Sequence, residues 1–147
     1  MVTLDELKDK LASNARLIGL DLGTKRIGIA ICDDKRKIAS PYKTIEYKNM
    51  DYLVNELINI IKDNNIFAVI IGNPINMDGS FGKSAQSIND KAKVIEKELD
   101  LIIAMWDERL STSGAFSISS NLDINFSKKK KNIDEKAAAF ILQGALD

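Results

Sequence analysis

The second half of the chain alternates between helical and strand-like patterns of apolar residues. A helical period over 51–62 is followed by a short apolar run at 66–71, and a second helical period over 83–99 is followed by another apolar run at 101–106. A last amphipathic stretch at 133–146 predicts a closing helix. Strands that alternate with helices in this way pair in parallel through right-handed crossovers.

The first half predicts an antiparallel meander instead. Apolar segments at 16–22 and 26–32 flank a Gly-Thr turn, which is typical of a β-hairpin. A third strand is expected within 37–47, where Pro41 places it at an edge of the sheet or at an irregularity. Together the two halves predict an α/β chain with a mixed five-stranded sheet flanked by helices.

Three segments lie outside this pattern. Residues 3–14 predict an exposed helix, so we interpret 1–15 as an N-terminal helical extension of a single domain at 16–147. A short helix is expected to end near residue 119. The segment 121–131 has no apolar period and contains four consecutive lysines, which predicts a mobile loop.

Length and composition fit one domain. The 147 residues are 45% hydrophobic, enough to bury a core, and 21 basic residues balance 21 acidic ones. No apolar run approaches the roughly 20 residues that span a bilayer, and the N-terminus is acidic where a signal peptide is basic. We therefore expect a cytoplasmic protein without membrane contact, whose neutral charge gives no global field to attract nucleic acid.

The chain contains no histidine, which removes the commonest general base and every Ser-His-Asp or Cys-His arrangement. The single cysteine, Cys32, can form no internal disulfide and no cysteine cluster for zinc, so it is expected to pack as a small apolar residue. Chemistry must therefore come from carboxylates, lysines, hydroxyls or a bound ion.

Acidic residues stand at the predicted ends of two strands. Asp21 lies near the end of an otherwise apolar strand, where an unpaired charge is penalised and a cation is expected to meet it. The alternative is a turn residue that caps the hairpin. Glu108 follows strand 101–106, at the carboxyl end where open α/β sheets place their sites. Its neighbour Asp107 competes for this role, and a solvated loop or a salt bridge with Arg109 explains either acid equally well.

Asp134 opens the last predicted helix. An acid at this position complements the helix dipole, yet Asn132 and Glu135 already resemble a capping box. Asp134 also belongs to the stripe that faces the sheet, with Ala137, Ala138, Ile141 and Ala145. An acid turned inward among alanines predicts that a second backbone segment or a metal approaches it closely.

Asp21, Glu108 and Asp134 come from separate elements, so they share one site only if the fold brings the ends of these elements together. Hard oxygen ligands of this kind suit Mg²⁺ or Mn²⁺. Two such ions about 4 Å apart stabilise both the attacking and the leaving oxygen of a phosphoryl displacement, and this chemistry needs no histidine.

Four segments of the chain resemble the YqgF family, also called RuvX, a group of Holliday-junction-resolvase-like proteins that is related to RuvC and belongs to the RNase H-like superfamily. They are 21–28 (DLGTKRIG), 76–79 (NMDG) with the helix that follows, 107–112 (DERLST) and 133–138 (IDEKAA). They occur in the family's order and cover about residues 16 to 146. The chain departs from the family in having Gly72-Asn73-Pro74 where Gly-Leu-Pro is usual, and in the helix at 3–14 that precedes the usual start.

The resemblance implies an RNase H-like fold in which Asp21, Glu108 and Asp134 are the catalytic carboxylates and hold Mg²⁺ or Mn²⁺. It also implies cleavage of structured RNA or DNA by metal-activated water. Of the two roles that the resemblance implies, maturation of the 5′ end of the 16S ribosomal RNA precursor is the leading one. Resolution of Holliday junctions is the role that was proposed earlier for the family. The partner is then pre-rRNA or branched DNA, and we expect a monomer or a weak homodimer.

Cations are needed to hold the phosphates of such a substrate. The candidates are Lys25 and Arg26 in the hairpin, Lys83 at a helix start, Arg109, and the lysine run 128–131. Arg109 is the strongest, because it stands beside an acid and either holds a phosphate by bidentate hydrogen bonds or braces that acid. Lys25 and Lys83 are equally compatible with solvated surface, and the composition of the run 128–131 favours a solvated loop.

Two other functions fit part of the pattern. The segment 21–24 followed by Gly28 resembles the first phosphate motif of actin-like and sugar-kinase-like ATPases, but those proteins need two such domains and no second Asp-x-Gly-Thr motif is present. The other is a non-catalytic RNA-binding factor in ribosome assembly that has kept the fold.

Overall fold

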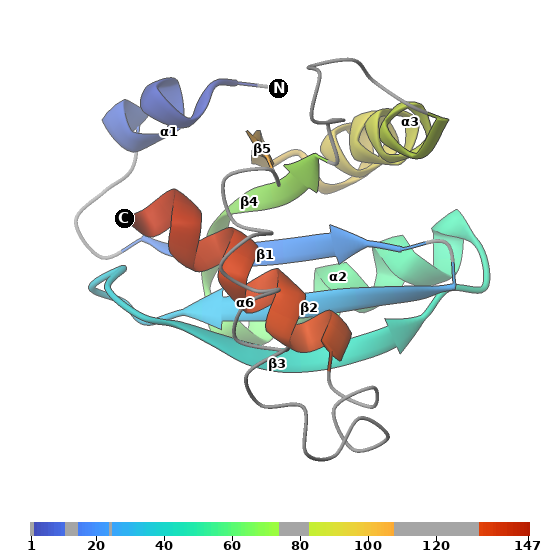
Figure 1. The fold of residues 1–147 in the computed structure, drawn as a ribbon, viewed down its shortest axis with the longest axis horizontal. Coiled ribbons are helices and arrows are strands. Elements are labelled where there is room, and N and C mark those ends of the chain that lie inside the picture. Colours follow the sequence, from blue (N-terminus) through green and yellow to red (C-terminus); the bar gives the residue numbers. More distant parts are fainter. Residues whose placement is uncertain (1, 11–14, 24, 74–82, 108–132) are drawn as a thin grey trace.

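The computed structural model describes residues 2–10, 15–23, 25–73, 83–107 and 133–147. Within them, one five-stranded sheet has the order β3-β2-β1-β4-β5 (Figure 1). The strands are β1 (Arg16–Leu22), β2 (Arg26–Cys32), β3 (Ala39–Glu46), β4 (Ile66–Asn73) and β5 (Ile102–Asp107). β2 is antiparallel to β1 and β3, whereas β4 is parallel to β1 and β5. The predicted mixed sheet is confirmed.

The edge position of β3 and the irregularity expected at Pro41 are both found. The pairing of β2 with β3 shifts between Ile29 and Ala30, which lie opposite Lys43 and Pro41. Proline donates no hydrogen bond to a neighbouring strand, so an edge strand with a local bulge accommodates it.

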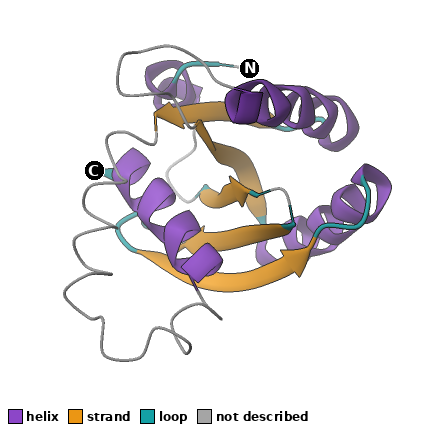
Figure 2. Cartoon of the chain, turned by 45° about the vertical axis from the view of Figure 1, so that its right-hand side comes forward, coloured by secondary structure: helices purple, strands orange, loops and turns teal. Residues whose placement is uncertain are grey.

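The helices form a layer on each face of the sheet (Figure 1 and Figure 2). α2 (Met50–Asn64) and α3 (Lys83–Leu99) pack on one face. α1 (Leu4–Lys10) and α6 (Ile133–Leu146) pack on the other. Because side chains alternate along a strand, β1 sends Ile18 and Leu20 to the α2–α3 face and Leu17 to the α6 face.

The N-terminal helix is not the exposed appendage that its sequence predicts. Leu7 is fully buried and packs in the same apolar cluster as α6. Val2 donates a backbone hydrogen bond of 2.9 Å to Ile103 and forms a parallel bridge with Ala104, so the chain before α1 extends the sheet beside β5. The division into an extension at 1–15 and a domain at 16–147 stays a prediction.

Two further expectations, the short helix near 119 and the mobile loop at 121–131, lie outside the described residues. In the part of the chain that is described, no helix has both the length and the apolar character needed to cross a bilayer.

Candidate active site at the start of α6

Asp21 and Asp134 lie on the same face of the sheet. Asp21 is two residues beyond Gly19, whose Cα faces Leu142 in α6, and it pairs across the hairpin with Gly28. The backbone of Asp134 lies directly on Gly28, because a Cβ added there would be 1.9 Å from the Asp134 carbonyl oxygen. The end of the central strand and the start of the last helix therefore meet, and the close backbone approach predicted for Asp134 is confirmed.

The two acids repel each other in a site that is partly shielded from water. Burial, and in second place the negative charge of Asp134, raise the pKa of Asp21 from 3.8 to about 6. The cation that the sequence predicts beside Asp21 is found on Asp134 instead. Within the described residues Asp21 has no ion-pair partner, whereas Arg26 Nε lies 2.9 Å from Asp134 Oδ2.

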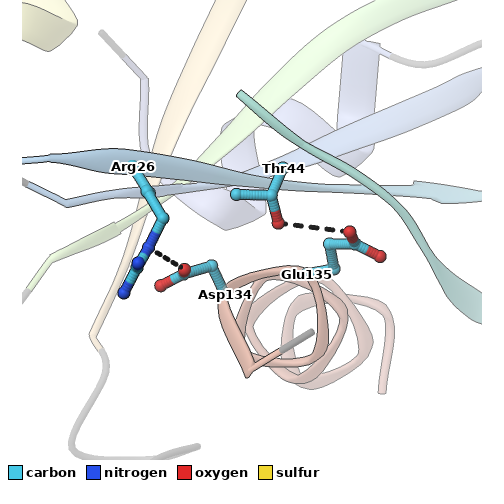
Figure 3. A network of polar contacts seen from close by, with 4 residues as sticks. All are labelled: Arg26, Thr44, Asp134 and Glu135. Carbon is cyan, nitrogen blue, oxygen red and sulfur yellow. Dashed lines mark hydrogen bonds and ion pairs between the residues drawn. The ribbon is translucent and has the colours of Figure 1, made fainter. Parts of the chain in front are cut away.

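Arg26 reaches Asp134 from the first residue of β2 (Figure 3). The contact uses only Nε, and the outer end of the guanidinium extends beyond it. The side chain of Arg26 is 51% exposed, compared with 21% for Asp134. Arg26 thus offsets the charge of one acid while about half of its own side chain remains exposed.

The next residue of α6, Glu135, fastens the helix to the edge strand. Thr44 Oγ1 donates a hydrogen bond of 3.2 Å to Glu135 Oε1 (Figure 3). Thr44 pairs with Gly28 on the side away from Asp21, so this bond lies next to the contact between Gly28 and Asp134. Asn132, the other member of the expected capping box, lies outside the described residues, and Glu135 instead reaches across to β3.

The remaining predicted residues are placed by the backbone alone or not at all. Asn73 and Asp107, the last residues of β4 and β5, pair with each other. They lie at the carboxyl end of the parallel strands, as Asp21 does. Glu108 is the residue after Asp107, and both Glu108 and Arg109 lie outside the described part, as does the run 128–131. The choice between Asp107 and Glu108 therefore stays a prediction.

Among the basic candidates, Lys25 and Arg26 are described with their side chains and Lys83 is not. Lys25 and Arg26 are exposed in and beside the hairpin turn, at the end of the sheet where β1 finishes one residue after Asp21. Lys83 is the first residue of α3, and the structure describes its backbone only.

The donor chemistry of the site fits a hard divalent cation. No group of three or more possible metal ligands is present within the described ranges, but Asp21 and Asp134 bring carboxylate oxygens from two elements to one place. A cation there would relieve the repulsion that raises the pKa of Asp21. Oxygen donors without cysteine or histidine are typical of Mg²⁺ and Mn²⁺ sites.

The sequence left the roles of Gly28 and Thr44 unassigned. Gly28 appeared only as part of a family motif, yet it is the position where α6 touches the sheet. A signal was available, because alternation along β2 places Arg26, Gly28 and Ala30 on one face and the middle residue has no side chain. No local signal connects Thr44 with Glu135, since 91 positions separate them.

These features define a class of protein: an RNase H-like fold with acids at the end of its central strand and at the start of its closing helix. Two solved structures share the fold. The Thermus thermophilus RuvC complex with a Holliday junction substrate has a TM-score of 0.57 at 10% identity, over 90% of this chain and 93% of that one. The yeast mitochondrial Holliday junction resolvase Ydc2 has a TM-score of 0.51 at 12% identity, over 97% and 82%.

The sequence comparisons identify the family within this class. The family model described as "RuvX: Holliday junction resolvase" matches residues 15–147. A Pelagibacter ubique protein named "Putative pre-16S rRNA nuclease" is 58% identical over 147 residues, covering 100% of this chain and 97% of the relative. A Rhodospirillum centenum protein of the same name is 40% identical, covering 98% and 79%. The chain belongs to the RuvX family, as its four motifs indicated.

Proposed function

We propose that this chain is a metal-dependent endonuclease that hydrolyses phosphodiester bonds in structured nucleic acid, and that its substrate in the cytoplasm is the 5′ region of the 16S ribosomal RNA precursor. The observation that carries the proposal is the juxtaposition of Asp21 and Asp134 across Gly28. The names of the relatives support the choice of substrate. Holliday junction DNA is the alternative substrate, supported by the description of the family.

In this proposal Asp21 and Asp134, together with Glu108, hold Mg²⁺ or Mn²⁺. When bound, such cations supply Lewis-acid stabilisation of the charge that develops on the phosphate and activate the attacking water. The protein supplies the geometry: β1 fixes Asp21, and the contact between Gly28 and α6 fixes the height of Asp134 above the sheet. With the water activated in this way, the reaction does not require a histidine as general base.

In this proposal the substrate is held by basic side chains around the carboxyl end of β1, where Asp21 lies. Arg26 has the best-supported place, because its half-exposed side chain lies beside Asp134 at the site (Figure 3). Lys25 adds charge from the same turn, and Lys83 and Arg109 complete the proposed set. Contacts of this kind position the phosphate backbone and carry no sequence information of their own.

The test compares cleavage of a precursor 16S rRNA fragment and of a four-way DNA junction in Mg²⁺, Mn²⁺ and EDTA. Asp21→Asn and Asp134→Asn should each lower the cleavage rate at least about a hundredfold, since each removes a charged metal ligand. Asp63→Asn, an exposed acid at the end of α2, is the matched control and should cleave at the wild-type rate.

Other outcomes would redirect the proposal. Equal rates for all four proteins would exclude catalysis by this site. Tight binding of precursor RNA without cleavage by any of them would indicate an assembly factor. Stabilisation of the fold by ATP without cleavage would indicate a nucleotide-binding protein.

A further inference from the structure

We propose that Arg26 is a metal-gated phosphate ligand, held by Asp134 in the metal-free protein and released toward the substrate when a divalent cation binds. The inference rests on the proposed function and concerns the regulation of the same site. It assigns Arg26 two successive partners rather than one.

The charges around the two acids give the first reason. Asp21 and Asp134 together carry up to two negative charges, and within the described residues Arg26 is their one ion-pair partner. A divalent cation that binds both acids would bring two positive charges close to the guanidinium. Arg26 and the metal therefore compete for Asp134, and each weakens the binding of the other.

The contact itself is of a kind that metal can displace. It is a single hydrogen bond from the Nε of a half-exposed arginine to an acid that is 21% exposed, and exposed ion pairs contribute only about 0.2–1 kcal/mol. Arg16, in contrast, is held by two hydrogen bonds to backbone carbonyls. Its Nε donates to the Cys32 carbonyl at 3.1 Å, and its Nη1 donates to the Asn64 carbonyl at 3.0 Å.

Release would require motion of the side chain only. The turn that carries Arg26 is held by backbone hydrogen bonds, from Gly23 N to the Arg26 carbonyl at 3.0 Å and from Tyr47 N to the Lys25 carbonyl at 2.9 Å. A guanidinium freed from Asp134 keeps its planar donor groups and its charge, which match the geometry of a phosphate. Metal binding would thus create a phosphate contact at the place where the metal is held.

The direct test follows the Nε–H signals of Arg26 and Arg16 by ¹⁵N NMR while Mg²⁺ is added to the full chain. We expect the Arg26 signal to shift and to exchange faster with water, while the Arg16 signal stays unchanged as an internal reference. Asp134→Asn should show the released Arg26 signal without Mg²⁺. If the wild type binds Mg²⁺ and the Arg26 signal does not change, the gate is excluded.

Metal affinity gives a second, independent readout. Calorimetry should show Mg²⁺ binding about threefold tighter or more in Arg26→Gln, because the competing cation is gone and exposed pairs have this magnitude. Lys25→Gln removes the same charge from the neighbouring position without breaking a pair to Asp134 and should bind Mg²⁺ within a factor of about two of wild type. Equal or weaker binding in Arg26→Gln than in Lys25→Gln would overturn the proposal.

Binding of a non-cleaved oligonucleotide completes the argument. In Ca²⁺, Arg26→Gln should bind a short RNA duplex more weakly than wild type, and in EDTA the two should bind alike, since Arg26 is then held by Asp134. A loss of affinity that is the same with and without Ca²⁺ would show that Arg26 is not gated. If the wild type binds no Mg²⁺ at all, the metal-dependent function itself fails, which is a result distinct from failure of the gate.

Discussion

The carbonyl oxygen of Asp134 occupies the space that a side chain at Gly28 would need. A Cβ there would lie 1.9 Å from the carbonyl oxygen and 2.3 Å from the carbonyl carbon of Asp134. Both neighbours are backbone atoms at the start of a helix, so no rotamer change can relieve the overlap. Gly28 therefore determines how closely an acid on α6 approaches an acid on β1.

Gly28→Ala should lift the first turn of α6 from the sheet. We expect a loss of about 1–3 kcal/mol in the free energy of unfolding, as for overpacking in other cores, and a Mg²⁺ affinity at least about tenfold weaker because Asp134 moves away from Asp21. Urea unfolding and calorimetry measure the two effects. Gly144→Ala, at the other end of the helix beside the Trp106 ring, is the control and should leave Mg²⁺ affinity unchanged.

The raised pKa of Asp21 makes a prediction about pH. Because the folded-state pKa is about 6 and the ordinary value is 3.8, the folded protein retains the Asp21 proton at a higher pH than the unfolded chain. The stabilising contribution is therefore complete below about pH 3.8 and is lost as pH rises through about 6. In EDTA at pH 7.5, Asp21→Asn should be more stable than wild type by about 1–3 kcal/mol.

The pH profile supplies the control for this prediction. The advantage of Asp21→Asn should shrink below pH 6 and disappear near pH 4, as measured by urea unfolding at each pH. The pKa of Asp33 is shifted in the opposite direction, because hydrogen bonds from the Ile38 and Lys37 amides lower it. Asp33→Asn should therefore be less stable than wild type at pH 7.5. A constant advantage of Asp21→Asn from pH 4 to 8 would contradict the assigned cause.

Local patterns predicted most of the fold because each reports on burial along a single element. The apolar segments of β1 and β2 have the bounds that the sequence indicated, and the stripe on α6 correctly turned Asp134 toward the sheet. The order of strands and helices then left few topologies, since parallel strands need crossovers of one hand. The meeting of Asp21 with Asp134 follows from that topology.

The sequence could not predict contacts that depend on the exact placement of distant elements. Arg26 and Asp134 are 108 positions apart, and the pairing of Arg26 with Asp134 rather than Asp21 depends on how far α6 extends along β2. The burial of Leu7 likewise depends on α6 and β5, which lie far along the chain. A period of apolar residues shows that a helix has an apolar face and does not show what covers it.

The hydrogen bond between Thr44 and Glu135 should contribute to the position of α6. Thr44→Val keeps the volume and removes the hydroxyl, so it should lower the free energy of unfolding by about 0.5–1.5 kcal/mol. Glu135→Gln keeps an acceptor oxygen and should cost less. A double-mutant cycle with Thr44→Val and Glu135→Ala measures the coupling, and a coupling energy near zero would show that the bond does not stabilise the helix start.

Stability and function should separate at Asn49, which caps α2 on the opposite face of the sheet. Its side-chain oxygen accepts a hydrogen bond of 2.8 Å from the Tyr52 amide, and its extended backbone is that of an N-cap residue. Asn49→Ala should therefore lower the free energy of unfolding by about 1 kcal/mol. Because α2 touches neither acid, Mg²⁺ affinity and the rate of RNA cleavage at a temperature well below unfolding should equal those of wild type. A variant that unfolds as predicted but also loses Mg²⁺ would show that the two faces of the sheet are energetically coupled.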